Sequence, residues 1–341
     1  MTARSITVLG DGAMATVCAI LLEGNGQDVR LWGPFADHLD QMRQTRRNDR
    51  YLPGFNLPPR LRFVDDDAAA LRDADLIVAA VPTQFIRGAW QRLAPHVPAG
   101  AAVVSVAKGI ENDTLLRPTQ IIADVMARAG KGDRLGSVAA LSGPSIAAEL
   151  ARRLPATVCV ASEDASFAAA LQQLFTSQWF RVYTNPDPLG VELAGATKNV
   201  IAIAAGILDG LHAGYNAKSA LLSRGLAEIT RLGLAMGARA ETFFGITGVG
   251  DLATTCFSPE GRNRTAGEKL GRGMKLERVL AEIPGIVEGV PTTRSVMQLA
   301  ARHDVEMPIT AAVHDVLFAG MDPIEGIGRL MTREPKEERV G

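Results

Sequence analysis

Residues 6–15 read ITVLGDGAMA, a short apolar run that leads at once into two glycines one residue apart. The run Ile6–Gly10 has the composition of a buried β-strand, and the segment that follows Ala13 has that of a helix. The stretch Gly10-Asp11-Gly12-Ala13-Met14-Ala15 fits the pattern GxGxxA, in which the first glycine permits a tight turn and the second lets the backbone approach a pyrophosphate. Because a helix N-terminus presents unpaired N–H groups, we expect a dinucleotide here. The alternative is an ordinary tight turn.

Short β-type runs continue to alternate with helical stretches up to about residue 185. The further expected strands are Val29–Trp32, Arg62–Val64, Leu76–Val81, Ala102–Val106 and Val138–Leu141, with Thr157–Ala161 and Phe180–Tyr183 extending the same sheet. This alternation predicts an α/β fold with a parallel, doubly wound sheet.

Beyond Pro188 the pattern becomes helical, with glycines between the helices. The expected helices are 191–209, 217–236, 264–271, 275–282, 292–303 and 309–319. The turn residues NPDP at 185–188 mark a boundary. We therefore predict a dinucleotide-binding domain over 1–188, an all-helical substrate and catalytic domain over 189–330, and a polar tail over 331–341.

Composition excludes several classes of function. The 341 residues hold 36 Lys+Arg against 37 Asp+Glu, so no basic excess favours nucleic acid. Cys18, Cys159 and Cys256 lie far apart and no CxxC occurs, so we expect neither disulfides nor a metal site, and a reducing, cytoplasmic setting. The start of the chain shows no signal-peptide pattern, and the longest apolar run is too short and too polar for stable membrane insertion.

The end of the second expected strand bears on cofactor choice. An Asp or Glu at that place would bind the ribose of NAD, but the sequence reads Leu31-Trp32-Gly33-Pro34. No arginine follows directly to bind a 2′-phosphate either. The preference between NAD and NADP stays open, with a lean to NADP or dual use.

Three segments lie at carboxyl ends of expected strands, where ligands bind in open α/β sheets. Val81-Pro82-Thr83 is expected to line the cofactor, and Lys108 either contacts a substrate oxygen or is a solvated loop lysine. Ser142-Gly143-Pro144-Ser145 predicts a helix start at the proline, which either holds an anion or is a simple cap.

Lys198 is the one charged side chain in LAGATKNVIAIAAGIL, residues 193–208. On a helix its neighbours are Ala194, Gly195, Ile201 and Ala202, none of which can pair with an ammonium group. Such a lysine extends to water, finds a distant carboxylate or lines a cleft. Burial would lower its pKa and suit it to proton transfer.

Two further polar clusters follow in the helical half. The glycines before Asp251 indicate close backbone packing or a tight loop, and the GRNR stretch at 261–264 offers two guanidinium groups suited to a phosphate, unless it is a solvated basic loop. Arg224, Glu228 and Arg231 share a helix face, which predicts surface ion pairs.

Taken in order, these segments resemble the bacterial NAD(P)-dependent glycerol-3-phosphate dehydrogenases. The resemblance covers nearly the whole chain and is carried by VLGDGAMAT, VPTQ, AKGIE, LSGPSIAAE, AGATKNVIAIAAGI, NAKSALLSRGLAEITRLG, GVGDLATTC, GRNR and VEGVPTT. It implies a Rossmann-type doubly wound sheet followed by an all-α C-terminal domain.

The resemblance also implies the chemistry. Dihydroxyacetone phosphate is interconverted with sn-glycerol 3-phosphate for phospholipid synthesis, with NADP or NAD as cofactor and Lys198 as the proton-transfer residue. The implied substrate contacts are Lys108, Gly143, Ser145, Lys198, Asp251, Arg262 and Asn263. The implied cofactor contacts are Gly10, Gly12, Ala13, Met14, Lys108, Ala147, Arg262, Ile286 and Glu288. A homodimer is the expected assembly.

The sequence departs from the family pattern at three places. Gly261 stands where the family usually has Ser, Ala13-Met14 stands for Ser/Thr-Trp, and Pro34 stands where a basic residue is frequent. The last departure puts strong NADP selectivity in doubt.

Two other functions compete with this interpretation. The same fold could serve a β-hydroxyacid or ketopantoate-type dehydrogenase, which would need a carboxylate site in place of a phosphate site. The second competing function is a dinucleotide sensor that does not catalyse a reaction and uses the helical half as a dimerisation module. The joint presence of Lys198, Lys108 and Asp251 argues against the sensor.

Overall fold

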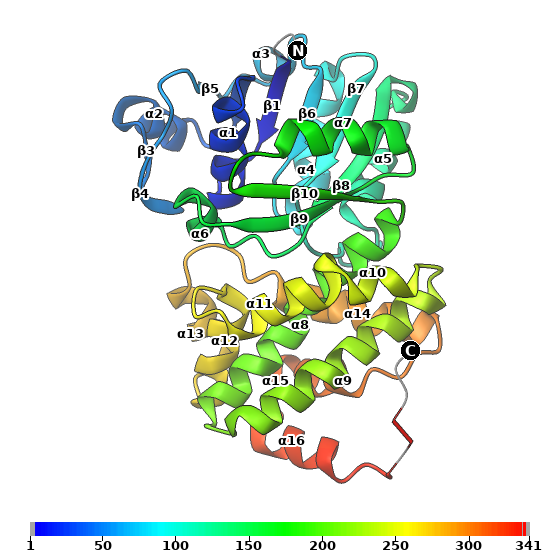
Figure 1. Ribbon diagram of the computed structural model, residues 1–341. Coiled ribbons are helices and arrows are strands. Elements are labelled where there is room, and N and C mark those ends of the chain that lie inside the picture. The colour runs from blue at the N-terminus through cyan, green and yellow to red at the C-terminus, as the bar shows by residue number, and fades with distance from the viewer. Residues whose placement is uncertain (1–3, 336, 339–341) are drawn as a thin grey trace. The chain divides into compact units, whose positions relative to one another are not determined.

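The chain folds into two compact units in the structure, a computed structural model that describes residues 4–335, 337 and 338 (Figure 1). The first unit comprises residues 1–107 and 118–188, and the second comprises 108–117 and 189–341. The segment 108–117 therefore belongs with the helices of the second unit.

An eight-stranded sheet forms the centre of the first unit, with strand order β10-β9-β8-β7-β6-β1-β2-β5. Its strands are β1 (Ser5–Leu9), β2 (Asp28–Trp32), β5 (Arg62–Val64), β6 (Leu76–Ala79), β7 (Ala101–Ser105), β8 (Leu135–Ser142), β9 (Ala156–Ala161) and β10 (Phe180–Asn185). All eight predicted strands are present, and the last two extend the sheet as expected. The pair β8–β9 is antiparallel while the other pairs are parallel, so the Rossmann-type sheet ends in two reversed strands.

Helices cover both faces of this sheet (Figure 1). Helices α1 (Ala13–Gly24) and α7 (Ala165–Phe175) pack on one face, and α4 (Thr83–Leu93) and α5 (Pro118–Arg128) pack together on the other. The shorter helices are α2 (Ala36–Thr45), α3 (Asp67–Leu71) and α6 (Ala147–Ala151). A small antiparallel pair, β3 (Arg47–Asn48) and β4 (Leu52–Asn56), was not predicted, because neither strand shows the apolar alternation of a half-buried strand.

The strand order reverses at β1, which lies between β6 and β2. In open α/β sheets the crevice at such a reversal is where ligands bind. Gly10 follows β1 directly and Ala80 follows β6, with the Ala80 N–H donating to the carbonyl of Leu9 at 2.9 Å. The fold therefore places the glycine loop at the crevice.

The second unit is helical, which confirms the predicted fold class. Its helices are α8 (Pro188–Gly210), α9 (Gly214–Ala235), α10 (Ala240–Phe244), the π-helix η3 (Ile246–Gly250), α11 (Asp251–Phe257), α12 (Arg262–Gly271), α13 (Leu276–Glu282), α14 (Gly289–Arg302), α15 (Pro308–Phe318) and α16 (Pro323–Met331). All six predicted helices occur. The sequence reading missed α10, η3, α11 and α16, whose periodic stretches are short.

Helix α8 is the core helix of this unit. By length and composition it could cross a membrane, but 89% of its most apolar window is buried inside the structure. Ile201 and Ile203 are fully buried in the hydrophobic core that this helix forms with its neighbours. The apolar run is therefore accounted for by packing within the unit.

Glycines let α8 and α12 cross at backbone contact. Gly206 and Gly210 on α8 face Gly267 and Gly271 on α12, and each helix places its two glycines four residues apart. A Cβ on Gly206 would collide with the carbonyl oxygen of Arg264, and one on Gly267 with that of Ile203. This crossing fixes the N-terminus of α12 beside the middle of α8.

The segment 108–117 is attached to these helices by side chains. Ser295 of α14 donates from its hydroxyl to the carbonyl of Ile110 at 3.1 Å and to the amide oxygen of Asn112 at 2.7 Å. Arg117 forms an ion pair with Glu192 of α8, whose side chain is 2% exposed. Lys108 begins this anchored segment.

Candidate active site

The glycine loop has the backbone that a pyrophosphate site requires. Gly10 has a φ of +123°, and a Cβ there would lie 2.9 Å from the carbonyl oxygen of Ala80. Gly12 is the N-cap of α1, and a Cβ on it would meet no described atom within 4 Å. No acidic side chain lies in the first turn, and no described side chain caps the helix. The loop thus combines a close turn, open space and unpaired N–H groups, so it fits a dinucleotide.

The Ser142–Ser145 segment differs from its prediction. The predicted helix start at Pro144 is wrong: α6 begins at Ala147, because Ile146 is its N-cap and has an extended backbone. Gly143 has a φ of +136°, and the Ser145 hydroxyl donates to the Gly143 carbonyl at 3.0 Å. Gly143 and Ser145 therefore lie in a turn that precedes the short helix.

Lys198 lies near the middle of α8 and its side chain is only 6% exposed. Its ammonium group forms an ion pair with one carboxylate oxygen of Asp251 and contacts the hydroxyl of Thr255 at 2.5 Å. Both partners come from α11, one helical turn apart. The Thr255 hydroxyl donates to the Asp251 carbonyl at 2.7 Å, so it accepts from the lysine. Of the alternatives that the sequence leaves open, the structure selects the distant carboxylate.

Asp251 holds a second lysine with its other oxygen. Lys108 Nζ lies 2.7 Å from Asp251 Oδ2, and its side chain is 19% exposed. The carboxylate itself is 2% exposed, so it is held almost entirely by the two ammonium groups. The Lys108 backbone is fixed as well, because Asn199 Nδ2 donates to its carbonyl at 3.3 Å.

The pKa of Lys198 is lowered to about 8, mainly by burial of the ammonium group and in part by the neighbouring charge of Lys108. Asp251 acts in the opposite direction, since its charge and its hydrogen bond favour the ammonium form. The net result places the proton equilibrium of Lys198 close to neutral pH, the range that suits a group which both donates and accepts a proton.

Thr255 was missed by sequence reasoning although it contacts Lys198 directly. The signal that could have found it is the spacing DxxxT in Asp251–Thr255, which places both side chains on one helix face. That helix was not predicted. The expected close backbone packing before Asp251 does occur: Gly248 packs so tightly on Phe243 that a Cβ would overlap its backbone.

A chain of amide groups joins the N-terminus of α12 to α8. Asn263 Nδ2 donates to Asn199 Oδ1 at 3.0 Å, and Asn263 Oδ1 accepts from the Gly289 N–H at 2.8 Å. One N–H of Asn263 is left without a partner among the described residues. Lys198, Asn199 and Asn263 are thus tied into one rigid group within the second unit.

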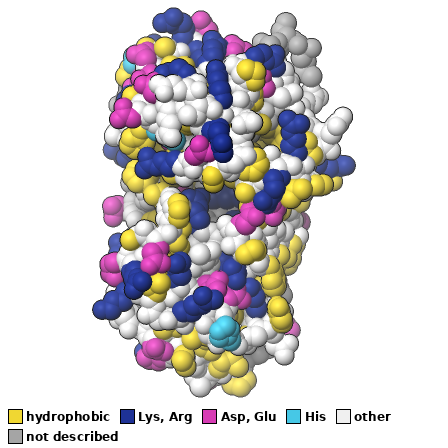
Figure 2. All heavy atoms as spheres, turned by 90° about the vertical axis from the view of Figure 1, so that its left-hand side faces the viewer, with side chains coloured by type: hydrophobic (Ala, Val, Ile, Leu, Met, Phe, Trp, Pro, Cys, Tyr) yellow, Lys and Arg dark blue, Asp and Glu magenta, His cyan; other side chains and the backbone are white. Residues whose placement is uncertain are grey.

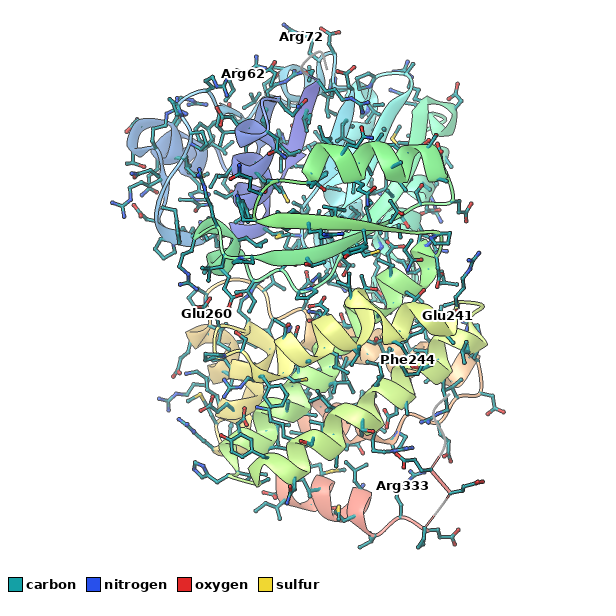
Figure 3. The ribbon with its side chains drawn as sticks, viewed as in Figure 1. Arg62, Arg72, Glu241, Phe244, Glu260 and Arg333 are labelled. Carbon is teal, nitrogen blue, oxygen red and sulfur yellow. The ribbon has the colours of Figure 1, made fainter. Side chains whose placement is uncertain are left out.

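The two arginines of the GRNR stretch have different surroundings. Arg264 is engaged in ion pairs within the protein, because its Nε donates to Asp209 at 2.6 Å and its guanidinium lies 3.3 Å from Glu268. Arg262 is exposed and makes no hydrogen bond to a described residue. Only Arg262 therefore offers its guanidinium to a ligand. Figure 3 labels Glu260 in the loop that leads to it.

Arg262 also lies against the loop that carries the other expected cofactor contacts. A Cβ on Gly285, which has a φ of +82°, would be 2.7 Å from Arg262 Nη1. Desolvation lowers the pKa of the Arg262 guanidinium, and the nearby charge of Glu288 acts against that lowering. Ile286 and Glu288 follow in the same loop, both partly buried. Gly261 is the N-cap of α12, where a Cβ would approach the Thr255 carbonyl oxygen to 3.3 Å.

The predicted surface ion pairs of Glu228 are wrong. Glu228 is 2% exposed, and its carboxylate accepts the N–H groups of Ile309 at 2.6 Å and Thr310 at 3.2 Å, at the start of α15. Burial raises its pKa to about 7. It lies in the wall of a mainly apolar cavity of about 910 Å³ formed by α8, α9, α15, α16 and the tail. Arg333 of the tail, which is labelled in Figure 3, is another lining residue. Lys198 does not line this cavity.

Neither the distribution of surface charge nor the placement of potential metal ligands among the described residues indicates a further site. Basic and acidic side chains are interspersed over the face in Figure 2, as the near-zero net charge leads one to expect. Among residues 4–335, 337 and 338, no group of three His, Cys, Asp or Glu side chains could hold a metal ion.

Comparison with known proteins agrees with this arrangement over both units. Residues 5–168 match the family model of the NAD-dependent glycerol-3-phosphate dehydrogenase N-terminus, and residues 187–328 match that of its C-terminus. A glycerol-3-phosphate dehydrogenase [NAD(P)+] of Geobacillus kaustophilus is 47% identical over 336 residues, covering 98% of this chain and 96% of the relative. One of Geobacter sulfurreducens is 48% identical over 334 residues, covering 98% of each chain.

A solved structure gives the same result. The glycerol-3-phosphate dehydrogenase of Coxiella burnetii superposes with a TM-score of 0.91 at 36% identity, covering 97% of this chain and 99% of the other. Two matched family models and these relatives cover the chain nearly from end to end. The chain therefore belongs to the NAD-dependent glycerol-3-phosphate dehydrogenase family.

Proposed function

We propose that this protein is an NAD(P)-dependent sn-glycerol-3-phosphate dehydrogenase that reduces dihydroxyacetone phosphate to sn-glycerol 3-phosphate for phospholipid synthesis. The observation that carries the proposal is the buried lysine Lys198, whose partner Asp251 is shared with Lys108. A group with a pKa of about 8 is placed to give a proton to a carbonyl oxygen and to take it back from the alcohol.

The second unit supplies the proton and the phosphate contacts in this proposal. Lys198 donates its proton to the substrate carbonyl oxygen, and Asp251 holds the ammonium group in place. Arg262 and the remaining N–H of Asn263 bind the phosphate, a pairing that guanidinium geometry favours. Lys108 contacts substrate and cofactor. The further proposed substrate contacts are Gly143 and Ser145.

The first unit holds the cofactor in this proposal. Gly10, Gly12, Ala13 and Met14 would bind the pyrophosphate, and the nicotinamide, when bound, supplies the hydride that reduces the substrate. Lys108, Ala147, Arg262, Ile286 and Glu288 complete the proposed cofactor contacts.

The domain roles follow from these assignments. We assign dinucleotide binding to 1–188 apart from the segment 108–117, substrate binding and catalysis to 189–330 together with that segment, and no part in catalysis to the tail 331–341. The three buried, unpaired thiols support a cytoplasmic location. A homodimer stays a prediction, to be checked by sedimentation.

The decisive experiment measures NADH and NADPH oxidation with dihydroxyacetone phosphate, and with 2- and 3-keto acids beside it. Lys198→Ala should lower turnover by about 10²–10⁴-fold while cofactor still binds, because the protein loses its proton donor. Near-normal turnover of that variant would remove Lys198 from the mechanism. Turnover of a keto acid alone would point to a ketopantoate-type enzyme, and cofactor binding without turnover would point to a sensor.

A further inference from the structure

The structure places a carboxylate at the end of β2, where the sequence shows none. In dinucleotide-binding sheets the acid that binds the adenosine ribose stands at the end of the second strand. Here β2 ends at Trp32, followed by Gly33. A Cβ on Gly33 would lie 2.9 Å from Cβ of Asp11 and 3.2 Å from its Oδ2. Asp11, the residue between the two loop glycines, therefore fills the space that a side chain at position 33 would occupy.

Asp11 is held firmly in this position. Its Oδ2 lies 2.9 Å from His38 Nδ1 of α2, and its backbone carbonyl accepts from Asn48 Nδ2 of β3 at 2.9 Å. The same Asn48 amide donates to Thr16 of α1 at 2.8 Å. Because α2 holds its carboxylate and β3 holds its backbone, Asp11 is preorganised at the end of β2.

As a neutral hydrogen-bond donor, His38 positions the Asp11 carboxylate and does not cancel its negative charge. The ring is 6% exposed and packs edge-on against Tyr51 with centroids 5.4 Å apart. Its Nε2 is buried and has no partner among the described residues, so a proton there would have no acceptor. The ring's N–H is therefore at Nδ1, where it donates to Asp11.

Nearby arginines are mostly engaged elsewhere. Arg43 pairs with Asp40, Arg46 donates to the Leu61 carbonyl at 2.7 Å, and Arg47 lies 3.1 Å from Asp49. Arg50 packs over the Tyr51 ring at 5.1 Å and has no ion pair with a described residue. Arg50 is thus the one guanidinium of this group that could counter a carboxylate.

We propose that Asp11, positioned by His38, makes this protein select NAD(H) over NADP(H). A fixed carboxylate accepts hydrogen bonds from the two ribose hydroxyls of NAD, whereas it repels the 2′-phosphate of NADP. Asp11 thus replaces the acid that usually stands at the end of the second strand, although it comes from the glycine loop. This inference rests on the proposed use of a nicotinamide cofactor and answers the preference that the sequence leaves open.

The test measures binding directly. NADH and NADPH are titrated into the full-length protein without substrate, followed by nicotinamide fluorescence and calorimetry. Unmodified protein should bind NADH at least about 10-fold more tightly than NADPH, because like-charge contact is costly. Asp11→Asn should reduce this ratio to about 3-fold or less, mainly by tightening NADPH binding.

Two further variants separate selectivity from folding. The double variant Asp11→Gly with Gly33→Asp moves the acid to the end of β2 and should restore the NADH preference, since the three atoms nearest to a Cβ at 33 all belong to the Asp11 side chain. Arg50→Gln should leave the ratio of the unmodified protein within about 2-fold. Thermal unfolding of each variant reports whether the fold survives.

Two results would overturn the inference. One is NADPH binding to unmodified protein as tightly as NADH, a measurement that needs no variant. The other is an unchanged ratio in a folded Asp11→Asn protein. Failure of the proposed function gives a different result. In that case the protein still binds NADH more tightly than NADPH but does not turn over dihydroxyacetone phosphate.

Discussion

The hydroxyl of Thr255 accepts a hydrogen bond from the ammonium group of Lys198 across 2.5 Å. The same hydroxyl donates to the Asp251 carbonyl, so its orientation is fixed by the first turn of α11. A lysine side chain has several rotatable bonds, and these two contacts on α11 hold its end at one point. The relationship makes Thr255 a positioning residue for the proposed proton donor.

Replacing Thr255 should therefore lower turnover more than it weakens substrate binding. Thr255→Val removes the acceptor with little change in volume, and hydrogen bonds to charged groups are worth about 1.5–3 kcal/mol, or roughly 10–100-fold in kcat. Thr255→Ser keeps the hydroxyl and should recover most of the rate. Steady-state kinetics of both variants would decide, and equal loss in the two would mean that the methyl group's packing matters instead.

The pH profile should follow Lys198, whose pKa is lowered to about 8 by burial. Reduction needs the ammonium form, so its kcat/KM should fall as pH rises through about 8. Oxidation of glycerol 3-phosphate needs the neutral amine, so its rate should rise to a plateau over the same range. Lys108→Met removes a charge that lowers this pKa and should move both limbs to higher pH. If both pH profiles of Lys108→Met match those of the unmodified protein, a group other than Lys198 controls them.

The helix crossing should not tolerate a methyl group. Gly267→Ala would place a Cβ into the carbonyl oxygen of Ile203, and we expect a loss of about 3 kcal/mol or more in unfolding free energy. Gly328→Ala on α16 is the matched control, because a Cβ there meets no described atom within 4 Å. That control should raise stability by about 0.5–1 kcal/mol. Denaturant unfolding of the pair tests the crossing, and equal stability of the two would contradict it.

Stability should fall with rising pH because of Glu228. Its pKa is raised from 4.5 to about 7 in the folded protein, so between these values the folded state binds more protons than the unfolded state. Its contribution to unfolding free energy therefore decreases as pH rises from about 4.5 to 7, by at most about 3 kcal/mol, and is constant above that.

Glu228→Gln cannot ionise, so the difference in unfolding free energy between it and the unmodified protein should change across pH 4.5–7.5. Other titrating groups cancel in that difference. Glu325→Gln, which breaks an exposed pair with Arg329, should change stability by less than about 1 kcal/mol. A difference that stays constant with pH for Glu228→Gln would show that its carboxyl ionises normally.

Sequence patterns predicted the fold better than they predicted contacts. The eight strands and the long helices follow from local alternation and periodicity, which act over neighbouring residues. The β3–β4 pair and α11 were missed because their local signal is weak and tertiary contacts stabilise them. Lys198 stood out as a lone charge in an apolar helix, but the identity of its partner depends on a contact between residues 53 positions apart. The Glu228 error has the same origin, since helix periodicity does not reveal that α15 covers that face.

Glycines show the same limit. Glycine lowers the stability of a helix interior, and the pairing of α8 with α12 explains why Gly206 and Gly267 occupy such positions. Asp11 lies inside a glycine pattern where the intervening residue carries no expected role. Its position beside Gly33 depends on how the loop packs against β2.

The assignment of 108–117 to the second unit means that the polypeptide passes from one unit to the other three times, after residues 107, 117 and 188. A gene cut at the apparent boundary near 188 would not yield two self-sufficient halves. The fragment from 189 onward would contain Lys198 and Asp251 but lack the lysine that shares the carboxylate. Recombination between relatives at that point would likewise combine the segment 108–117 of one parent with the helices α8 and α14 of another, which hold that segment in place. The two units are therefore expected to be inherited, expressed and engineered as one piece.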